Sequence, residues 1–434
     1  MHALGLDIGT TKLSLVSVTP ESGEVTTIAS APTPALPPMP DAPWAHLQDA
    51  AGILALAEDM LGRVDLHDVC AIGVTGQMHG IVYLDERGQS ISPLYTWEDE
   101  RGGEASPTGL SYAAEYGIPA GYGHVTHLYN RDHGLVPARA AGYCTIADAL
   151  TARLCASAQP TVHASNAASL GGYLLRENDF SDKLPLTYPY RVVLDYALAG
   201  TYRKIPVAVA IGDNQASFFG SGCAGEDILI NIGTGSQVSR LVEHVTEGDG
   251  VECRPATEGK FLQVGAALCG GRAYAMLNRF FCDVVAMAGF PRPTELYGQM
   301  TALVGEGEDA RLRFENTFCG TRAMPWRRGS IRGLGEDNFT PRDFCIGILE
   351  GMVNELAELY GAMGCYTDRL VGAGNALRKN PVLCKMCEKR FGAHLILPRY
   401  TEEAACGAAL YALIATGTLK NMSAARDMLR GHNI

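Results

Sequence analysis

Two aspartates stand near a glycine where a predicted strand ends: Asp7 lies two residues before Gly9, and Asp213 directly follows Gly212. A carboxylate such as that of Asp7 repels a bare phosphate, so its position suggests a bridging Mg2+ that is held through water. Asp213 has the right chemistry for a general base acting on a substrate hydroxyl. An aspartate at the start of a helix is, however, more often an N-cap. Both side chains are candidate metal ligands.

A glycine–threonine turn follows Asp7. Alternating apolar and small polar residues on both sides predict two strands joined by Gly9, Thr10 and Thr11. Glycine lets a ligand approach the backbone closely, and consecutive N–H groups in such a turn bind an anion. The threonine hydroxyls and the charge of Lys12 add to this capacity. The pattern indicates a phosphate-binding loop, with an ordinary polar hairpin as the alternative.

The same device occurs again in the second half of the chain. An apolar strand over residues 228–232 leads into a turn, and a second strand covers residues 238–242. The turn consists of Gly233, Thr234, Gly235 and Ser236. Two such loops opening halves of similar size are more specific than either alone. We therefore expect a duplicated domain whose two phosphate loops face one cleft.

A third glycine turn follows the predicted strand 369–371. It comprises Gly372, Ala373 and Gly374, and a helix is predicted to run from there through Arg390. A dinucleotide-binding motif would need a glycine where Leu377 stands and an acidic residue about 20 positions later. Neither is present, so a turn beneath a flat adenine fits better. Asn375 and Asn380 are the candidate contacts to that base.

A buried parallel strand is predicted over residues 69–75, and it ends in Gly76-Gln77-Met78-His79-Gly80. Ligands of α/β sheets bind at the carboxyl ends of parallel strands. The two glycines allow a sharp turn that presents an amide and an imidazole. The segment predicts a substrate-binding loop, and a plain surface loop is the alternative.

Two further segments carry residue types that suit a polyol. Trp97, Asp99 and Arg101 combine an aromatic face with groups that form bidentate hydrogen bonds to neighbouring hydroxyls. A charged loop with a half-buried tryptophan is the alternative. Asn166, in a predicted loop of small residues at 165–169, is another candidate contact, although turn chemistry explains it equally well.

Length and composition set broad limits. A chain of 434 residues suits two domains of about 200 residues, and we place them at 1–204 and 205–434. The second begins with the predicted strand 206–211. The net charge of −12 argues against non-specific nucleic-acid binding. There is no apolar run of membrane-spanning length. The 13 cysteines are scattered and odd in number, which suits a cytoplasmic protein better than a set of disulfides.

Taken together, these motifs resemble those of the FGGY carbohydrate kinases of the actin-like ATPase superfamily, almost from end to end. The resemblance implies an α/β fold of two duplicated actin-like (ribonuclease H-like) domains with the active site between them. It implies ATP and Mg2+ as cofactors and phosphorylation of a sugar hydroxyl with Asp213 as base. The expected partner is a small-molecule sugar, with no nucleic acid or membrane and with a homodimer as the possible assembly.

Within that family, the Gln-Met-His loop is shared by xylulokinases and sedoheptulokinases. Segments 121–126, 166–169, 212–217 and 376–383 resemble the sedoheptulokinases. The resemblance thus favours sedoheptulose, with xylulose or another ketose as the alternative. One departure is Gly235-Ser236, where many relatives carry a second hydroxyl residue. A nucleotide-dependent binding protein of the same superfamily is the alternative from another class, whereas a P-loop kinase is excluded because no GxxxxGK[ST] occurs.

Overall fold

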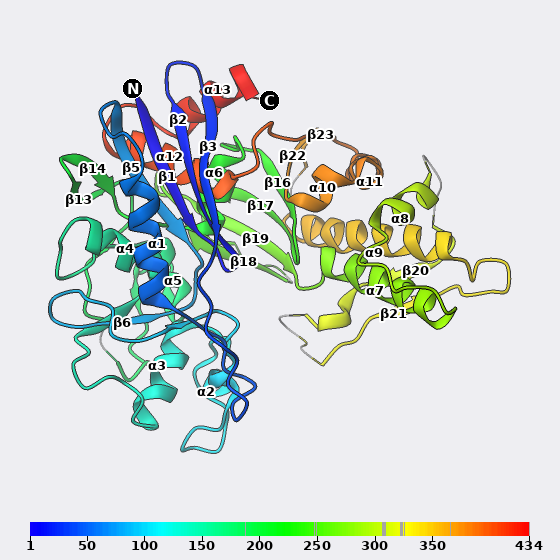
Figure 1. The fold of residues 1–434 in the computed structure, drawn as a ribbon, viewed down its shortest axis with the longest axis horizontal. Coiled ribbons are helices and arrows are strands. Elements are labelled where there is room, and N and C mark those ends of the chain that lie inside the picture. Colours follow the sequence, from blue (N-terminus) through cyan, green and yellow to red (C-terminus); the bar gives the residue numbers. More distant parts are fainter. Residues whose placement is uncertain are drawn as a thin grey trace.

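The chain forms two α/β lobes, each built on one mixed sheet (Figure 1). The structure is a computed structural model, and it describes residues 1–186, 188–246, 248, 250–305, 310–321, 324, 326–364 and 366–433. No helix within these ranges is both long and apolar enough to cross a membrane.

The first sheet has the strand order β13-β14-β5-β1-β2-β3. Its antiparallel part consists of β1 (His2–Ile8), β2 (Lys12–Thr19) and β3 (Glu24–Pro32). On the other side of β1 lies β5 (Val69–Gly76), which runs parallel to it. β14 (Ile205–Ala208) and the short β15 (Ile211–Gly212) are both parallel to β5, and β13 (Leu198–Tyr202) closes the edge.

The second sheet repeats this plan in the order β18-β19-β17-β16-β22-β23. The hairpin β16 (Ile228–Ile232) and β17 (Ser236–Val242) corresponds to β1 and β2, and the parallel β22 (Arg369–Ala373) corresponds to β5. β18 (Val251–Pro255), β19 (Phe261–Ala267) and β23 (His394–Ile396) complete it. This repetition confirms the predicted duplicated fold.

The predicted division after residue 204 does not coincide with the division between the sheets. The strand expected to open the second domain is β14, and it pairs with β5 of the first sheet. The second sheet starts only at β16. Apolar periodicity identifies a buried strand but does not identify the strand that it pairs with, so this difference could not be seen in the sequence.

Helices cover both sheets (Figure 1). Their starts follow capping rules: Asp49 accepts a hydrogen bond from Gly52 N at the start of α1, and Thr340 with Pro341 begins α9. The α-helices are α1 (Ala50–Gly62), α2 (Tyr112–Tyr116), α3 (Gly123–Asp132), α4 (Ile146–Leu154), α5 (Ala164–Ser169), α6 (Asp213–Gly220), α7 (Gly271–Met287), α8 (Tyr297–Val304), α9 (Pro341–Ala362), α10 (Asn375–Lys379), α11 (Pro381–Phe391), α12 (Glu403–Ala415) and α13 (Met422–Asn433).

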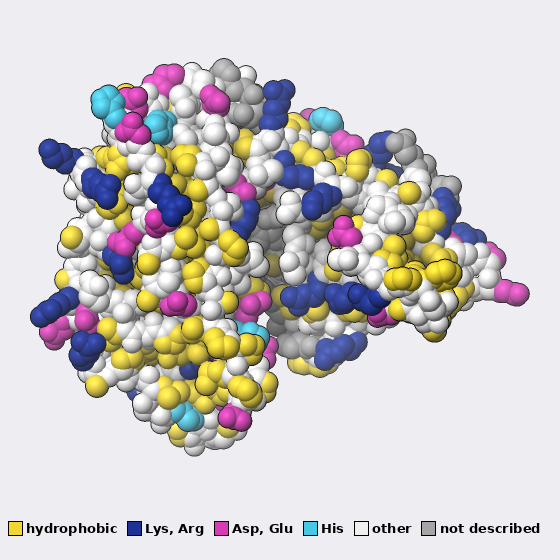
Figure 2. All heavy atoms as spheres, in the orientation of Figure 1, with side chains coloured by type: hydrophobic (Ala, Val, Ile, Leu, Met, Phe, Trp, Pro, Cys, Tyr) yellow, Lys and Arg dark blue, Asp and Glu magenta, His cyan; other side chains and the backbone are white. Residues whose placement is uncertain are grey.

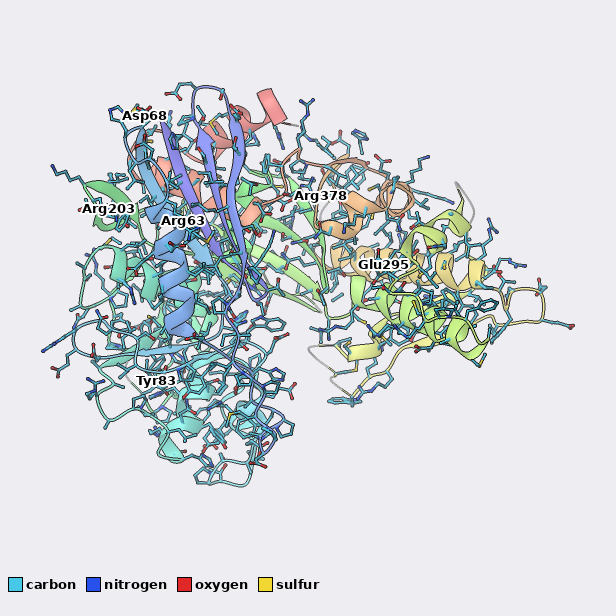
Figure 3. All side chains as sticks on the ribbon, viewed as in Figure 1. Arg63, Asp68, Tyr83, Arg203, Glu295 and Arg378 are labelled. Atoms are coloured by element: carbon cyan, nitrogen blue, oxygen red, sulfur yellow. The ribbon has the colours of Figure 1, made fainter. Side chains whose placement is uncertain are left out.

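Helix α12, near the end of the chain, returns to the first lobe and packs against β1, β5 and α6. Glycines make this close approach feasible, because a β-carbon at Gly5 or Gly73 would lie 1.9 Å from a carbonyl oxygen of α12. The first residue of α12, Glu403, pairs with Arg378 of the second lobe at 2.6 Å. Arg378 is labelled in Figure 3, where it lies at the junction of the two lobes.

Candidate active site

Three strands of the first sheet end side by side, and each delivers a predicted site residue. β1 and β15 flank β5, since Asp7 and Ile211 are both register partners of Thr75. Asp7 therefore lies at the same sheet edge as Gln77, which follows β5, and Asp213, which follows β15. Carboxyl ends of parallel strands form the usual ligand site of α/β sheets. The molecular surface is hollowed between the lobes in Figure 2.

Asp213 is the first residue of α6 and is not its N-cap. The N-cap is Gly212, so the carboxylate is not used to cap the helix. Its Oδ1 accepts a hydrogen bond of 2.7 Å from Asn214 Nδ2. Burial raises the pKa of Asp213 to about 6, against the opposing effects of the Arg254 charge and the Asn214 hydrogen bonds. A carboxylate with this pKa is ionised at neutral pH and is suited to accept a proton.

Asp7 lies in an acidic environment. Burial raises its pKa to about 7, with further contributions from the charges of Asp213 and Glu402, while Lys12 lowers it. Lys12 Nζ itself pairs with Glu402 Oε1 at 2.6 Å. Asp7 and Asp213, two half-buried carboxylates whose charges interact, could both supply oxygen ligands to a divalent cation. Within the described ranges, no three His, Cys, Asp or Glu side chains are placed to hold a metal together, so a Mg2+ here would need phosphate and water as its other ligands.

The predicted first phosphate loop has its carbonyl groups hydrogen-bonded to the protein, and its other side is exposed. Gly9 N donates to Lys12 O at 3.0 Å, which closes the turn. Thr33 Oγ1 donates to Gly9 O at 2.8 Å, and Gln48 Nε2 donates to Thr10 O at 2.7 Å. Thr11 and Lys12 are exposed. The carbonyl groups therefore face the protein, and the exposed side is available to an anion.

The second phosphate loop rests on the start of α7. Gly233 and Thr234 are exposed, and their carbonyl oxygens accept hydrogen bonds from Gly271 N at 2.9 Å and Arg272 N at 3.0 Å. A β-carbon at Gly270 would lie 2.5 Å from the backbone of Gly235. Sequence reasoning missed this support, although the adjacent glycines 270 and 271 are a signal for such a close approach.

Ser236 differs from its expected position. It is the first residue of β17 and is buried, and its hydroxyl has no hydrogen-bond partner. The side chain is therefore turned into the protein, since successive strand residues point to opposite faces. The exposed backbone at Gly233 and Thr234 is what this loop offers to a phosphate.

The third glycine turn packs against the end of β16. Gly374 has a φ of +91°, and a β-carbon there would lie 2.4 Å from Ile232 O. Ala373 pairs with Asn231, so this turn lies next to the second phosphate loop. Asn375 opens α10. The predicted single helix is in fact two, broken at Asn380, because Pro381 cannot continue a preceding helix.

Asn380 has a structural role in this break. Its Oδ1 accepts a hydrogen bond from Leu383 N at 3.1 Å and caps α11, and the side chain is buried. The side-chain oxygen of Asn380, which was predicted to contact adenine, is therefore used within the protein. An asparagine before a proline is a common helix start, which was the available sequence signal.

The Gln-Met-His loop lies beside the start of α6, which carries Asp213. Met78 Sδ accepts a weak hydrogen bond from Asn214 Nδ2 at 3.4 Å. His79 adopts a φ of +72°, which is unusual for a residue with a side chain. Its ring stacks on Tyr122 at 4.0 Å, and Nδ1 lies 2.8 Å from Ser169 O. These contacts hold a strained backbone conformation next to the site, as is common where ligands bind.

Asp99 and Arg101 form a buried ion pair, and both are at most 3% exposed. The guanidinium donates to both carboxylate oxygens, at 2.6 and 2.9 Å, and lies 4.3 Å from the ring centre of Tyr95. These two side chains therefore stabilise the loop that carries Trp97. The tryptophan is 44% exposed, and its indole N–H reaches Thr10 Oγ1 at 3.0 Å.

Asn166 lies on α5, where the sequence predicted a loop of small residues. Its Nδ2 donates to Asp148 Oδ1 at 3.0 Å and to Ala210 O at 3.3 Å. The neighbouring Ser165 Oγ accepts from Gly212 N at 2.9 Å. Both side chains hold the strand that leads to Asp213. Ser165, Asn166 and Ser169 are residue types that favour turns, which is why the six-residue helix was not predicted.

Sequence reasoning also missed Arg254, on β18 of the second sheet. It is 8% exposed and is paired with Glu252, and its charge lowers the pKa of Asp213. Gln215 Nε2 donates to Pro255 O at 2.7 Å and joins β18 to α6. No sequence pattern predicts that β18, at the edge of the second sheet, lies beside α6, which follows β15 of the first sheet.

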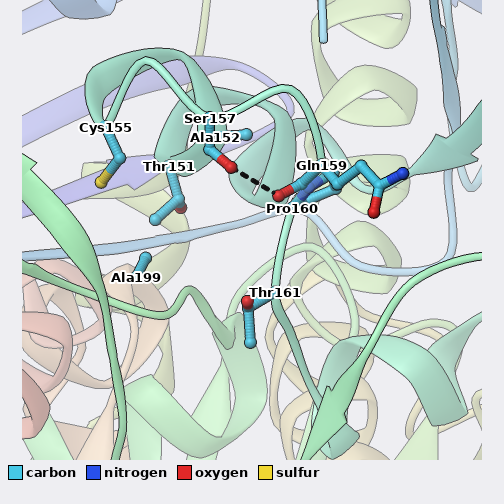
Figure 4. A pocket seen from close by; sticks show the side chains of 8 residues that line it. All are labelled: Thr151, Ala152, Cys155, Ser157, Gln159, Pro160, Thr161 and Ala199. Atoms are coloured by element: carbon cyan, nitrogen blue, oxygen red, sulfur yellow. Dashed lines mark hydrogen bonds between the residues drawn. The ribbon is translucent and has the colours of Figure 1, made fainter. Parts of the chain in front are cut away.

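A small pocket at the end of α4 has fewer side chains that could take part in a reaction (Figure 4). Ser157 Oγ donates to Gln159 O at 2.7 Å across its rim. Cys155 is its one ionisable lining side chain, and burial raises the pKa of that thiol to about 11. The site at the ends of β1, β5 and β15 is therefore the candidate active site.

Comparison with known proteins agrees with this geometry. Residues 2–107 match the N-terminal domain, and residues 228–416 the C-terminal domain, of the FGGY family of carbohydrate kinases. A sedoheptulokinase from Mus musculus is 28% identical over 94% of this chain and 97% of its own length. A xylulose kinase from Streptomyces rubiginosus is 27% identical over 41% of this chain and 42% of its own.

Among solved structures, a ligand-bound xylulose kinase from Lactobacillus acidophilus superposes with a TM-score of 0.82, covering 100% of this chain and 92% of the other at 16% identity. That likeness shows a shared fold. With both family domains matched in order along the chain, this protein belongs to the FGGY family of carbohydrate kinases and is an ATP-dependent sugar kinase.

Proposed function

We propose that the sugar is sedoheptulose and that the product is sedoheptulose 7-phosphate. The observation that carries this proposal is identity together with coverage: the sedoheptulokinase of mouse is 28% identical over 94% of the chain. The Streptomyces xylulose kinase aligns over 41% of it, and a gluconokinase from Bacillus subtilis aligns over 99% at 22% identity.

We assign the following roles to the site residues. Asp213 accepts the proton of the primary hydroxyl, whose oxygen attacks the γ-phosphorus of ATP while the bond to ADP breaks. The backbone at Gly9–Thr11 and at Gly233–Thr234 binds the phosphates, and Asp7 would hold Mg2+ through water. The cation supplies charge neutralisation when it is bound. Such reactions depend mainly on positioning and electrostatic stabilisation.

Sugar recognition falls to the loop residues on the first lobe. We assign Gln77, His79 and Trp97 to the ketose. Gln77 and His79 are in the loop that follows β5, and Trp97 reaches Thr10 at the end of β1. We propose that Asp99, Arg101 and Asn166 act behind this layer, since their polar atoms have buried partners within the protein.

An ADP-release assay with ATP and Mg2+ tests the proposal across sedoheptulose, xylulose, ribulose and glycerol. We expect sedoheptulose to give the highest kcat/KM, with a product of the mass of a heptulose monophosphate. An Asp213→Asn preparation purified in parallel measures the background from contaminating kinases. A higher kcat/KM for xylulose would replace the proposed substrate. No stimulation by any of the four would favour a nucleotide-dependent binding role.

A further inference from the structure

Thr10 of the first phosphate loop is bound by side chains from two segments that border the sugar site. Its carbonyl oxygen accepts a hydrogen bond from Gln48 Nε2 at 2.7 Å. Its hydroxyl oxygen accepts one from Trp97 Nε1 at 3.0 Å. A single residue of the phosphate loop is thus held from both sides by groups that do not belong to that loop.

Gln48 also contacts the sugar-binding loop. It lies on β4 (Leu47–Gln48), which pairs with β7 (Leu94–Tyr95) just before Trp97, and it is 8% exposed. Its Oε1 accepts a hydrogen bond from Gln77 Nε2 at 2.8 Å. The amide of Gln48 therefore bridges Gln77 and Thr10, which lie at the ends of two different strands.

The direction of these hydrogen bonds is fixed by chemistry. A backbone carbonyl only accepts, so the NH2 group of Gln48 must face Thr10, and its oxygen must face Gln77. Gln77 then has to present its own NH2 group to Gln48. This leaves Gln77 Oε1 as a buried acceptor with no partner, and a buried polar atom without a hydrogen bond is costly.

The direction of the hydrogen bond at the Thr10 hydroxyl is fixed in the same way. The indole N–H of Trp97 can only donate, so it occupies a lone pair of Thr10 Oγ1. The hydroxyl proton stays available to donate, and Thr10 lies in the loop that faces phosphate. Both contacts therefore leave Thr10 oriented as a donor toward an anion.

We propose that Gln48 is a positioning residue, which fixes Thr10 for phosphate binding and links that position to Gln77 in the sugar loop. This inference rests on the proposed function, because it takes the two sites to be those for nucleotide and ketose. A ketose that orders Gln77 also orders Gln48 and Thr10, so the nucleotide then binds with less loss of conformational entropy. By linkage, the nucleotide favours the ketose by the same factor.

The test is the variant Gln48→Met, which keeps the length of the side chain and removes both hydrogen bonds. Calorimetric titration with a non-hydrolysable ATP analogue and Mg2+ gives the dissociation constant with and without sedoheptulose. Without sugar, we expect the constant to rise about threefold to tenfold, as for the loss of one or two hydrogen bonds. In the wild-type protein, the sugar should lower it by about fivefold or more, and in Gln48→Met this ratio should approach one.

Gln89→Met is a matched control, because Gln89 is exposed and its backbone bonds with Asp85 and not with either loop. Trp97→Phe keeps the aromatic ring but removes the N–H group, and it should weaken analogue binding in the same direction. Trp97 is exposed, so Trp97→Phe can still test the positioning of Thr10 if Gln48→Met does not fold.

An unchanged dissociation constant in both variants would overturn the assignment of Gln48. A raised constant with an undiminished sugar effect would overturn the link to Gln77 while leaving the role at Thr10. If no ketose stimulates the wild-type protein, the proposed function fails, and the measurement without sugar still decides whether Gln48 positions the phosphate loop.

Discussion

Asp7 and Asp213 lie on opposite sides of β5, close enough for the charge of Asp213 to contribute to raising the pKa of Asp7 to about 7. Burial is the larger cause for both residues. Two carboxylates with raised pKa values thus stand where we propose a cation and a proton acceptor. Their ionisation should therefore be visible in the pH dependence of the reaction.

We expect kcat/KM to fall as the pH decreases through about 6 to 7. Asp213 must be ionised to accept a proton, and its pKa of about 6 lies above the ordinary value of 3.8. The fall should therefore begin well above the pH at which an exposed aspartate is protonated. Initial rates between pH 5 and 8.5 measure it, and a profile that stays flat down to pH 5 would contradict the assignment.

Asp213→Asn should lower kcat by at least about 100-fold, because general-base assistance contributes roughly that much or more. Binding of a non-hydrolysable ATP analogue should remain nearly unchanged, since the loops that hold phosphate are intact. Asp182→Asn, at an exposed position, is the control and should retain activity. Near-normal turnover of the Asp213 variant would remove this residue from the role of base.

Arg101→Met should destabilise the protein by about 3–5 kcal/mol, because it leaves the buried carboxylate of Asp99 without its partner. Urea unfolding measures this loss. Arg63→Met removes an exposed ion pair with Asp59 and should have little effect. A stable Arg101 variant with a greatly increased KM for the sugar would instead support direct sugar binding.

Gly407→Ala tests the packing of α12 on α6. A β-carbon there would lie 1.8 Å from Ala216 O, so the helices must move apart, at a cost of about 1–3 kcal/mol. Gly361→Ala, in α9, meets no atom within 4 Å and should stabilise by about 0.5–1 kcal/mol. Thermal unfolding of the pair gives the comparison, and equal effects would show that α12 adapts without strain.

Asp148→Asn should make stability less dependent on pH. Burial raises the pKa of Asp148 to about 7, against hydrogen bonds from Thr145 and Asn166. A raised folded-state pKa stabilises below about pH 4, and this stabilisation is lost as the pH rises to about 7. Relative to the variant, the wild-type protein should lose up to about 1.4 kcal/mol per pH unit in this window. Parallel curves from urea unfolding at several pH values would contradict this.

The parts of the fold that the sequence predicted are those encoded locally. Alternating apolar residues identified β1, β2, β16 and β17, and glycines identified the turns between them. The repetition of strand, glycine–threonine turn and strand then predicted the duplicated fold. Each strand–turn–strand unit is short, from His2 to Thr19 and from Ile228 to Val242.

The parts that were missed depend on contacts distant in sequence. The pairing of β14 with β5 and the approach of Arg254 to Asp213 join segments more than 40 residues apart. Gln48 acquires its partners only when β4 pairs with β7. Asp99, Arg101 and Asn166 have the residue types of a sugar site, and only the structure shows that their polar atoms have partners within the protein.

The return of α12 to the first sheet also bears on how the protein is made. A ribosome completes β1 and β5 early, but the helix that covers them spans Glu403–Ala415. The apolar face of the first sheet must therefore stay uncovered by α12 until about 330 residues beyond β5 have been translated. Nascent chains of this kinase should be unusually dependent on chaperones, which bind such exposed apolar surfaces during synthesis.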